Sequence, residues 1–248
     1  MKILGIIPAR YASSRFPGKP LVDIRGKSMI RRVFEQAKKS RKLSDVVVAT
    51  DDQRIYDEIN SFGGRATMTS PDHKNGTERC AEVAEKLSAD FFINIQGDEP
   101  YIHPQQIDDL ALLLDQKTEL GTLVKQIKDQ VLLEKDSVMK VVLDVEGNAI
   151  YFSRQCIPYV RDLPKNKWLD HQVFWKHIGI YAYRSDILKE IVKLPPGNLE
   201  QAESLEQLRW LENGYKIRVA KTEFESVSID TPQDLALLNQ KIEDGKIS

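Results

Sequence analysis

The chain has 248 residues, and its 36 lysines and arginines nearly balance its 37 aspartates and glutamates, giving a formal net charge of −1. This balance argues against a protein that binds nucleic acid along a basic face. Two widely separated cysteines, Cys80 and Cys156, exclude a disulfide-rich secreted domain and fit a reducing compartment. No apolar run approaches ~18 residues, and residues 3–7 are too short for a signal peptide, so we expect a cytoplasmic protein that does not enter membranes.

Short apolar segments alternate with helical patterns over the first half of the chain. Apolar residues have helical spacing over residues 29–37 and 80–87, and Thr77 is expected to cap the second of these helices. This alternation is typical of β-α-β units, so we predict an α/β fold with a doubly wound, mostly parallel sheet. The expected strands are residues 3–7, 46–49, 66–68, 91–95 and 122–127.

The middle of the chain predicts an antiparallel excursion from this sheet. Apolar arms at residues 139–143 and 149–152 flank Glu146-Gly147-Asn148, a pattern typical of a β-hairpin. We therefore predict a single domain over residues 1–248, with the hairpin and an irregular lobe at about 139–176.

The last third of the chain returns to regular elements. A strand is expected at residues 178–183, and a helix over residues 205–211 is expected to end at Gly214. Thr231, followed by a proline, is expected to begin the last helix.

A polar loop rich in cations follows the first expected strand. Residues 8–20 contain Arg10, Arg15 and Lys19, together with two serines and a glycine. Such a loop can wrap a polyphosphate, and ligands of open α/β sheets gather beyond the carboxyl ends of strands. Taken alone, the loop could equally be a solvated basic surface. It is not a P-loop, and the chain contains no G-x-G, which argues against a dehydrogenase.

An acidic loop follows a second expected strand. Gln96-Gly97-Asp98-Glu99-Pro100 places a carboxylate at the tip of the strand at 91–95, which is costly unless a positive group meets it. A Mg2+ ion held by one or two carboxylates and by substrate phosphates is one solution, and an ordinary acidic turn is the other. The cationic and acidic loops together favour a site for phosphates and metal.

A series of motifs runs from I-P-A-R-Y-A-S-S-R at 7–15 through Q-G-D-E-P at 96–100 and H-I-G-I-Y at 177–181 to D-T-P at 230–232. This series resembles the 3-deoxy-manno-octulosonate (KDO) cytidylyltransferases, which make CMP-KDO. Each motif is short, but their combined order over almost the whole chain is highly specific. The resemblance implies a nucleotidyltransferase fold of the GT-A-like type and a cytosolic homodimer of lipopolysaccharide-producing cells, with residues 139–152 as the candidate interface. The motifs are I-P-A-R-Y-A-S-S-R at 7–15, P-G-K-P-L at 17–21, V-A-T-D-D at 48–52, N-G-T-E-R at 75–79, Q-G-D-E-P at 96–100, V-V-L-D at 141–144, Y-F-S-R at 151–154, H-I-G-I-Y at 177–181, L-E-Q-L at 205–208 and D-T-P at 230–232.

The resemblance also implies which residues bind the nucleotide and the metal. In this family the first loop embraces CTP, and Mg2+ is the cofactor. Asp98 and Asp230 match the metal ligands, and with Lys19 they are the expected catalytic residues. The expected nucleotide-binding residues are Pro8, Ala9, Arg10, Arg15, Lys19, Gly76, Thr77 and Arg79.

A second set of matched positions is implied to hold the acidic sugar. Arg154 suits its carboxylate because a guanidinium can bind one through two parallel hydrogen bonds. A structural role is the alternative at each position, and a histidine such as His177 on an apolar strand is more often a core residue. The expected sugar-binding residues are Gln96, Arg154, His177, Tyr181, Glu206 and Gln207.

The expected reaction is in-line attack of the anomeric hydroxyl of the sugar on the α-phosphorus of CTP, with release of pyrophosphate. Rival substrates are 8-amino-KDO and nonulosonic acids, whose carboxylates the same arginine would serve. A non-catalytic nucleotide-binding module is a further alternative, and it predicts lost acidic ligands, whereas Asp98 and Asp230 are both present.

Overall fold

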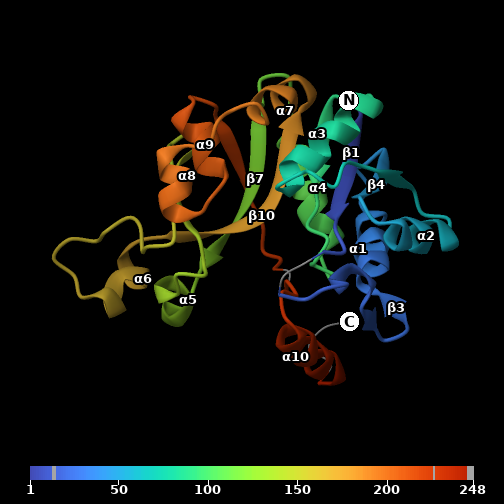
Figure 1. The fold of residues 1–248 in the computed structure, drawn as a ribbon. Coiled ribbons are helices and arrows are strands. Elements are labelled where there is room, and N and C mark those ends of the chain that lie inside the picture. Colours follow the sequence, from blue (N-terminus) through green and yellow to red (C-terminus); the bar gives the residue numbers. More distant parts are fainter. Residues whose placement is uncertain (13–14, 226, 245–248) are drawn as a thin grey trace.

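The computed structural model describes residues 1–12, 15–225 and 227–244 and is built around one large mixed sheet (Figure 1). Its strands are β1 (Ile3–Ala9), β4 (Asp45–Thr50), β5 (Ala66–Met68), β6 (Phe91–Asn94), β7 (Leu120–Ile127), β8 (Lys140–Leu143), β9 (Ala149–Ser153), β10 (Phe174–Arg184) and β11 (Ile217–Lys221). The main path is ordered β11-β7-β10-β6-β1-β4-β5, and β8 joins it through β10 and carries β9. Two short strands, β2 (Asp23–Ile24) and β3 (Lys27–Ser28), form a separate pair.

Most neighbouring strands on the main path run parallel. β1 lies between β4 and β6 in parallel register, β5 is parallel to β4, and β11 is parallel to β7. β10 alone runs antiparallel to its neighbours on this path, β6 and β7. The predicted α/β class with a mostly parallel sheet is therefore confirmed.

The register of β10 against β7 shifts once. Ile178 pairs with Leu123, and the next paired residue of β10, Tyr181, pairs with Thr122, so two residues of β10 have no partner on β7. Such a bulge bends a strand and re-aims its backbone groups. Here the Gly179 carbonyl accepts a hydrogen bond of 2.7 Å from the side-chain amide of Gln96.

Helices cover both faces of the sheet, as a doubly wound fold requires. Alternate residues of β1 serve the two hydrophobic cores, with Ile7 in one cluster and Ile6 in the other. The first core is completed by α1 (Met29–Ala37), α2 (Gln53–Ser61) and α4 (Pro104–Leu112), and the second by α3 (Gly76–Lys86), α7 (Ser185–Ile191) and α9 (Gln207–Glu212). Within the described ranges, no helix combines the length and the apolar character needed to cross a membrane.

The predicted hairpin is present, and most of its apolar side chains face inward. Val141 and Phe152 are buried in the second core, whereas Val145 at the turn is fully exposed. Beyond it lies a small lobe with its own cluster around Trp168 and Phe174. Figure 1 shows α5 (Gln130–Glu134) and α6 (Trp168–His171) projecting from the sheet at this end; η2 (Lys165–Lys167) precedes α6.

Two expectations about element boundaries are wrong. Asn75 rather than Thr77 caps α3, because the Asn75 side chain accepts a hydrogen bond of 2.8 Å from the Glu78 amide, while Thr77 lies within the first turn. The irregular region also ends early, since β10 begins at Phe174 and pairs there with β7. Polar and charged residues at 175–177 hide this start of the strand from an analysis of apolar runs.

The C-terminal predictions hold more closely. α9 ends just before Gly214, which adopts a left-handed φ of 83°. α10 (Pro232–Glu243) is capped by Thr231, whose side chain accepts from the Asp234 amide.

Candidate functional site

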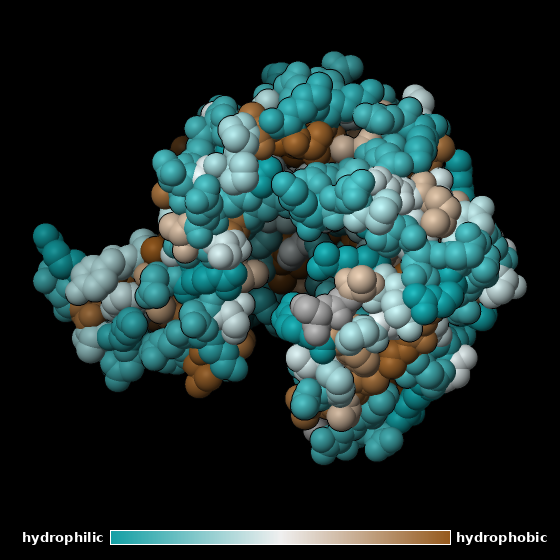
Figure 2. All heavy atoms as spheres, in the orientation of Figure 1, coloured by the Kyte–Doolittle hydropathy of each residue, from teal (hydrophilic) through white to brown (hydrophobic). Residues whose placement is uncertain are grey.

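A cavity of about 260 Å³ lies beyond the carboxyl ends of β1 and β6. The molecule is hollowed near the centre of the face seen in Figure 2, between the part that carries α8 (Asn198–Glu203) and the part that carries α1 and α10. Four chain segments line the cavity: the loop after β1 with η1 (Lys19–Leu21), the loop before α3, the loop after β6, and the residue before the α10 cap. The lining residues are Pro8, Ala9, Arg10, Arg15, Lys19, Pro20, His73, Lys74, Asn75, Gly76, Arg79, Gln96, Gly97, Asp98 and Asp230.

Lys19 joins the two aspartates that are far apart in sequence. Its Nζ lies 2.9 Å from Asp98 Oδ2 and 3.2 Å from Asp230 Oδ1, and its side chain is only 14% exposed. Arg15 Nη2 adds a contact of 3.1 Å to the same oxygen of Asp230. The structure therefore brings the three expected catalytic residues to one point in the cavity.

Backbone hydrogen bonds fix the position of Asp230. The amide of Ile229 donates to the Asp98 carbonyl at 2.9 Å, which ties the two acidic segments together. The Asp230 amide donates to the Asp234 carboxylate in the first turn of α10. The turn after β6 and the capped start of α10 thus hold the two carboxylates close together.

The loops at the base of the cavity approach one another too closely for larger side chains. A Cβ on Gly97 would lie 2.7 Å from the Pro8 carbonyl oxygen, a backbone atom that cannot swing away. A Cβ on Gly76 would lie 3.3 Å from the Pro8 ring. These two glycines therefore allow the loop after β6 and the start of α3 to pack directly against Pro8.

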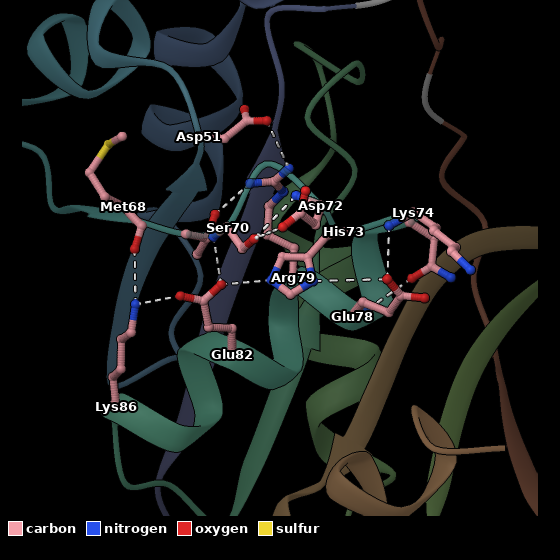
Figure 3. A network of polar contacts seen from close by, with 12 residues as sticks. Asp51, Met68, Ser70, Asp72, His73, Lys74, Glu78, Arg79, Glu82 and Lys86 are labelled. Atoms are coloured by element: carbon pink, nitrogen blue, oxygen red, sulfur yellow. Dashed lines mark hydrogen bonds and ion pairs between the residues drawn. The ribbon is translucent and has the colours of Figure 1, made fainter.

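Arg79 extends from α3 to the cavity, and its guanidinium forms an ion pair with Asp51. Its Nη2 lies 3.3 Å from Asp51 Oδ2 (Figure 3). Its Nη1 donates to the Thr69 hydroxyl. The side chain is almost fully buried. Arg79 is therefore a rigid part of the wall that links β4, β5 and α3.

His73 and Glu82 hold the loop before α3 against that helix (Figure 3). The His73 Nε2 lies 2.6 Å from Glu82 Oε2, and the same carboxylate accepts from the Ser70 amide and from Lys86. Burial raises the pKa of Glu82, but the hydrogen bonds from Lys86, Ser70 and His73 outweigh it and hold that pKa at about 2. Glu82 is therefore ionised, and the loop is firmly placed.

Five lining residues were not assigned to the site by the sequence analysis; Pro20 and Gly97 lie within motifs that it named, and the other three come from the loop before α3. His73, Lys74 and Asn75 line the cavity. Their position just before a helix N-terminus, where backbone N–H groups favour anions, is the signal that could have identified them.

Thr77 is the one expected nucleotide-binding residue that the structure does not place in the lining of this cavity. Its buried hydroxyl donates to Glu206 Oε2 at 2.9 Å and lies 3.3 Å from the Tyr183 hydroxyl. Burial raises the pKa of the Glu206 carboxyl, and the bond from Thr77 opposes this. Thr77 thus connects the start of α3 to the residue that precedes α9.

Of the expected sugar-binding residues, Gln96 is the one in the cavity lining, and it also contacts β10 through Gly179. His177 and Tyr181 lie on β10 with ring centroids 5.2 Å apart. Gln207 is buried at the start of α9. These residues therefore extend from the edge of the cavity toward the hairpin and α9.

His177 is buried with one ring nitrogen satisfied. Its Nε2 lies 3.0 Å from the Thr122 hydroxyl, which itself donates to the Ile180 carbonyl at 2.7 Å, so His177 Nε2 is the donor in that contact. His177 Nδ1 is buried without a hydrogen-bond partner in the described part of the chain. Burial, with a smaller contribution from the charge of Lys176, lowers the pKa of His177 to about 3, so the ring is neutral.

Arg154 lies just after β9 and is surrounded by backbone carbonyls. Its Nε donates to the backbone carbonyl of Glu203 at 2.7 Å. Its terminal nitrogens lie 3.4 Å from the backbone carbonyls of Asp136 and Ser204. The ion pairs found among residues 1–12, 15–225 and 227–244 do not include Arg154. Within these residues the guanidinium of Arg154 is therefore held by main-chain carbonyls and not by a carboxylate.

Comparison with known proteins identifies relatives of nearly equal length. The chain is 53% identical to a 3-deoxy-manno-octulosonate cytidylyltransferase of Cytophaga hutchinsonii, over 95% of each chain. It is 47% identical to the protein of the same name from Geobacter sulfurreducens, over 98% of this chain and 100% of the other.

Solved structures agree with these relatives. A CMP:2-keto-3-deoxy-manno-octonic acid synthetase complexed with CTP superposes with a TM-score of 0.92 at 41% identity, covering 99% of this chain and 100% of the other. A cytidylyltransferase from Leptospira borgpetersenii, at 17% identity and a TM-score of 0.65, shares the fold; the match covers 98% of this chain and 87% of that one. The cytidylyltransferase family matches residues 4–217. The chain therefore belongs to the 3-deoxy-manno-octulosonate cytidylyltransferases.

Proposed function

We propose that this chain transfers CMP from CTP to KDO, giving CMP-KDO and pyrophosphate and so activating the sugar for lipopolysaccharide synthesis. The observation that carries the proposal is the contact of Lys19 with both Asp98 and Asp230 in the cavity beyond β1 and β6. The named relatives, about half identical over almost the whole chain, support KDO as the acceptor.

The charge of the cavity favours a triphosphate. Five cationic side chains line it against two carboxylates, Asp98 and Asp230, and a surplus of positive charge remains even though Arg79 is paired with Asp51. Phosphate oxygens accept strong charge-assisted hydrogen bonds from such groups. The five cationic residues are Arg10, Arg15, Lys19, Lys74 and Arg79.

The acidic pair fits a magnesium site. Both carboxylates place an oxygen within 3.2 Å of the same Lys19 nitrogen, so their negative charges converge where a cation is held. Mg2+ is commonly bound by one or two carboxylates and by substrate phosphates. Asp98 and Asp230 would hold the ion, which would neutralise phosphate charge and lower the pKa of the attacking hydroxyl.

The sugar acid is proposed to lie between Gln96 and the hairpin. Arg154, whose guanidinium contacts carbonyls and no carboxylate of the described chain, would bind the carboxylate of the sugar. The unpaired Nδ1 of neutral His177 can accept a hydrogen bond from a hydroxyl of the sugar. Tyr181, Glu206 and Gln207 complete the proposed contacts.

The reaction needs positioning more than covalent chemistry from the protein. The anomeric hydroxyl attacks the α-phosphorus and gives up its proton to solvent water. The bond from the α-phosphorus to the bridging β-phosphate oxygen breaks, and pyrophosphate leaves with that electron pair. Lys19 and Arg15 would stabilise the charge on the departing pyrophosphate. Gln96 would help to hold the sugar in line, because its side chain is anchored to the Gly179 carbonyl of β10.

The direct test is pyrophosphate release by the purified chain with CTP and Mg2+, with and without KDO. We expect release to depend on both CTP and KDO. A panel that includes 8-amino-KDO and a nonulosonic acid identifies the preferred acceptor. Release that ignores the sugar acid, or a preference for one of the other sugars, would contradict the assignment of KDO.

Replacing Asp98 with asparagine removes one of the two proposed metal ligands. We expect kcat to fall by about two orders of magnitude or more with the fold unchanged, because charge stabilisation is a large part of catalysis. Chelation of Mg2+ is expected to abolish turnover of the wild-type chain. Asp57→Asn, at an exposed position on α2, is the matched control; near-wild-type kcat for Asp98→Asn would rule out its role.

Burial of neutral His177 predicts a pH dependence of stability. With the pKa of His177 at about 3 in the folded chain against 6.5 as its ordinary value, the unfolded chain binds the extra proton between these values. The free energy of unfolding should therefore fall as pH decreases from 6.5 toward 3, by up to about 1.4 kcal/mol per pH unit from this residue. Urea unfolding of wild type and His177→Gln at several pH values measures the difference, and equal slopes would contradict it.

We also propose a cytoplasmic homodimer that uses the hairpin at residues 139–152. Ile150 on β9 is 59% exposed and, with fully exposed Val145, offers apolar surface on this hairpin. Sedimentation at micromolar concentration is expected to give a dimer, and Ile150→Glu is expected to give monomers. Leu112→Glu, at a 64% exposed position on α4, is the control; a monomeric wild-type chain would exclude the dimer.

A further inference from the structure

Charged side chains hydrogen-bond to both the amide and the carbonyl of Arg154. Its amide donates to Glu203 Oε2 at 3.0 Å, and its carbonyl accepts from the ammonium of Lys140. Its own Nε returns to the Glu203 backbone carbonyl at 2.7 Å. Arg154 follows the end of β9, and these three hydrogen bonds fix its position there.

The hydrogen bond to the Arg154 carbonyl comes from a buried lysine. Lys140 on β8 is fully buried, and its Nζ also donates to the carbonyls of Lys135 at 2.8 Å and Val138 at 2.6 Å. The three ammonium protons are thus used on main-chain oxygens. Lys140 therefore fixes the loop before β8 and Arg154 together.

The hydrogen bond from the Arg154 amide is accepted by the last residue of α8. Glu203 accepts from the Ser153 hydroxyl at 2.6 Å through one oxygen and from the Arg154 amide through the other. Ser204, which follows it, has a left-handed φ of 53° and presents its carbonyl to Arg154 Nη2 at 3.4 Å. Strained backbone of this kind is often kept where a functional group must be placed.

We propose that Glu203 is a positioning residue, which acts by fixing Arg154 so that its guanidinium faces the carboxylate of the sugar acid. This inference rests on the proposed function, because that function gives Arg154 its substrate. Glu203 also lies three residues before Glu206 and four before Gln207, so fixing the end of α8 places these two residues as well.

The test compares two glutamates of the same helix. Glu203→Ala removes both acceptors and is expected to raise the KM for KDO by roughly tenfold, while the KM for CTP changes by less than about twofold. Glu200→Ala is the matched control, because Glu200 is paired with Arg209 and the Gly197 amide and does not touch Arg154. It is expected to lower the Tm and to leave the ratio of the two KM values unchanged.

A conservative variant and a double-mutant cycle separate positioning from a merely structural role. In Glu203→Gln, the side-chain oxygen of the glutamine can accept from the Arg154 backbone amide, and its side-chain nitrogen can donate to the Ser153 hydroxyl. The KM for KDO of this variant should therefore lie close to the wild-type value. In an Arg154→Ala background, Glu203→Ala is expected to add less than about twofold, because both changes remove the same interaction.

The outcomes for the two proposals are distinct. Absence of KDO-dependent turnover in the wild-type chain would overturn the proposed function and this inference with it. Normal wild-type turnover with an unchanged KM for KDO in Glu203→Ala would overturn this inference alone. So would an equal rise in both KM values, or a full tenfold effect of Glu203→Ala without Arg154.

Discussion

The contact of one ammonium with two carboxylates organises the site. Lys19, Asp98 and Asp230 come from three segments of the chain, and each would be costly to hold half-buried alone. Lys19 and Arg15 together balance the two carboxylates, and other cationic groups of the cavity remain in surplus. The close approach of Gly97 to Pro8 and the hydrogen bond from Ile229 to Asp98 hold these segments of the chain together.

The parts of this arrangement that sequence could predict are those set by local periodicity. The apolar runs of β1 and β6 identify buried strands, and the rule that ligands collect beyond strand ends then places the loops containing Lys19 and Asp98. Asp230 has no such signal, because it lies between a strand and a helix in an unremarkable turn. Its place follows from the family resemblance and from long-range contacts seen in the structure.

The parts that sequence missed depend on tertiary partners. Lys140 occurs within an apolar strand, and nothing near it in sequence reveals that three backbone carbonyls will receive its ammonium. Asn75, and not Thr77, caps α3. The hydroxyl of Thr77 instead donates to Glu206, which is distant in the sequence. Capping preferences alone rank both residues as acceptable.

The bulge in β10 has a consequence for how this strand tolerates change. Two extra residues, an even number, leave His177 and Tyr181 pointing to the same side of the sheet as the tyrosine at 183, even though the register has moved. Loss or gain of a single residue here would send every side chain on one flank to the opposite layer. A change of two residues, by contrast, preserves the alternation of the strand and keeps His177 and Tyr181 on one face of the sheet.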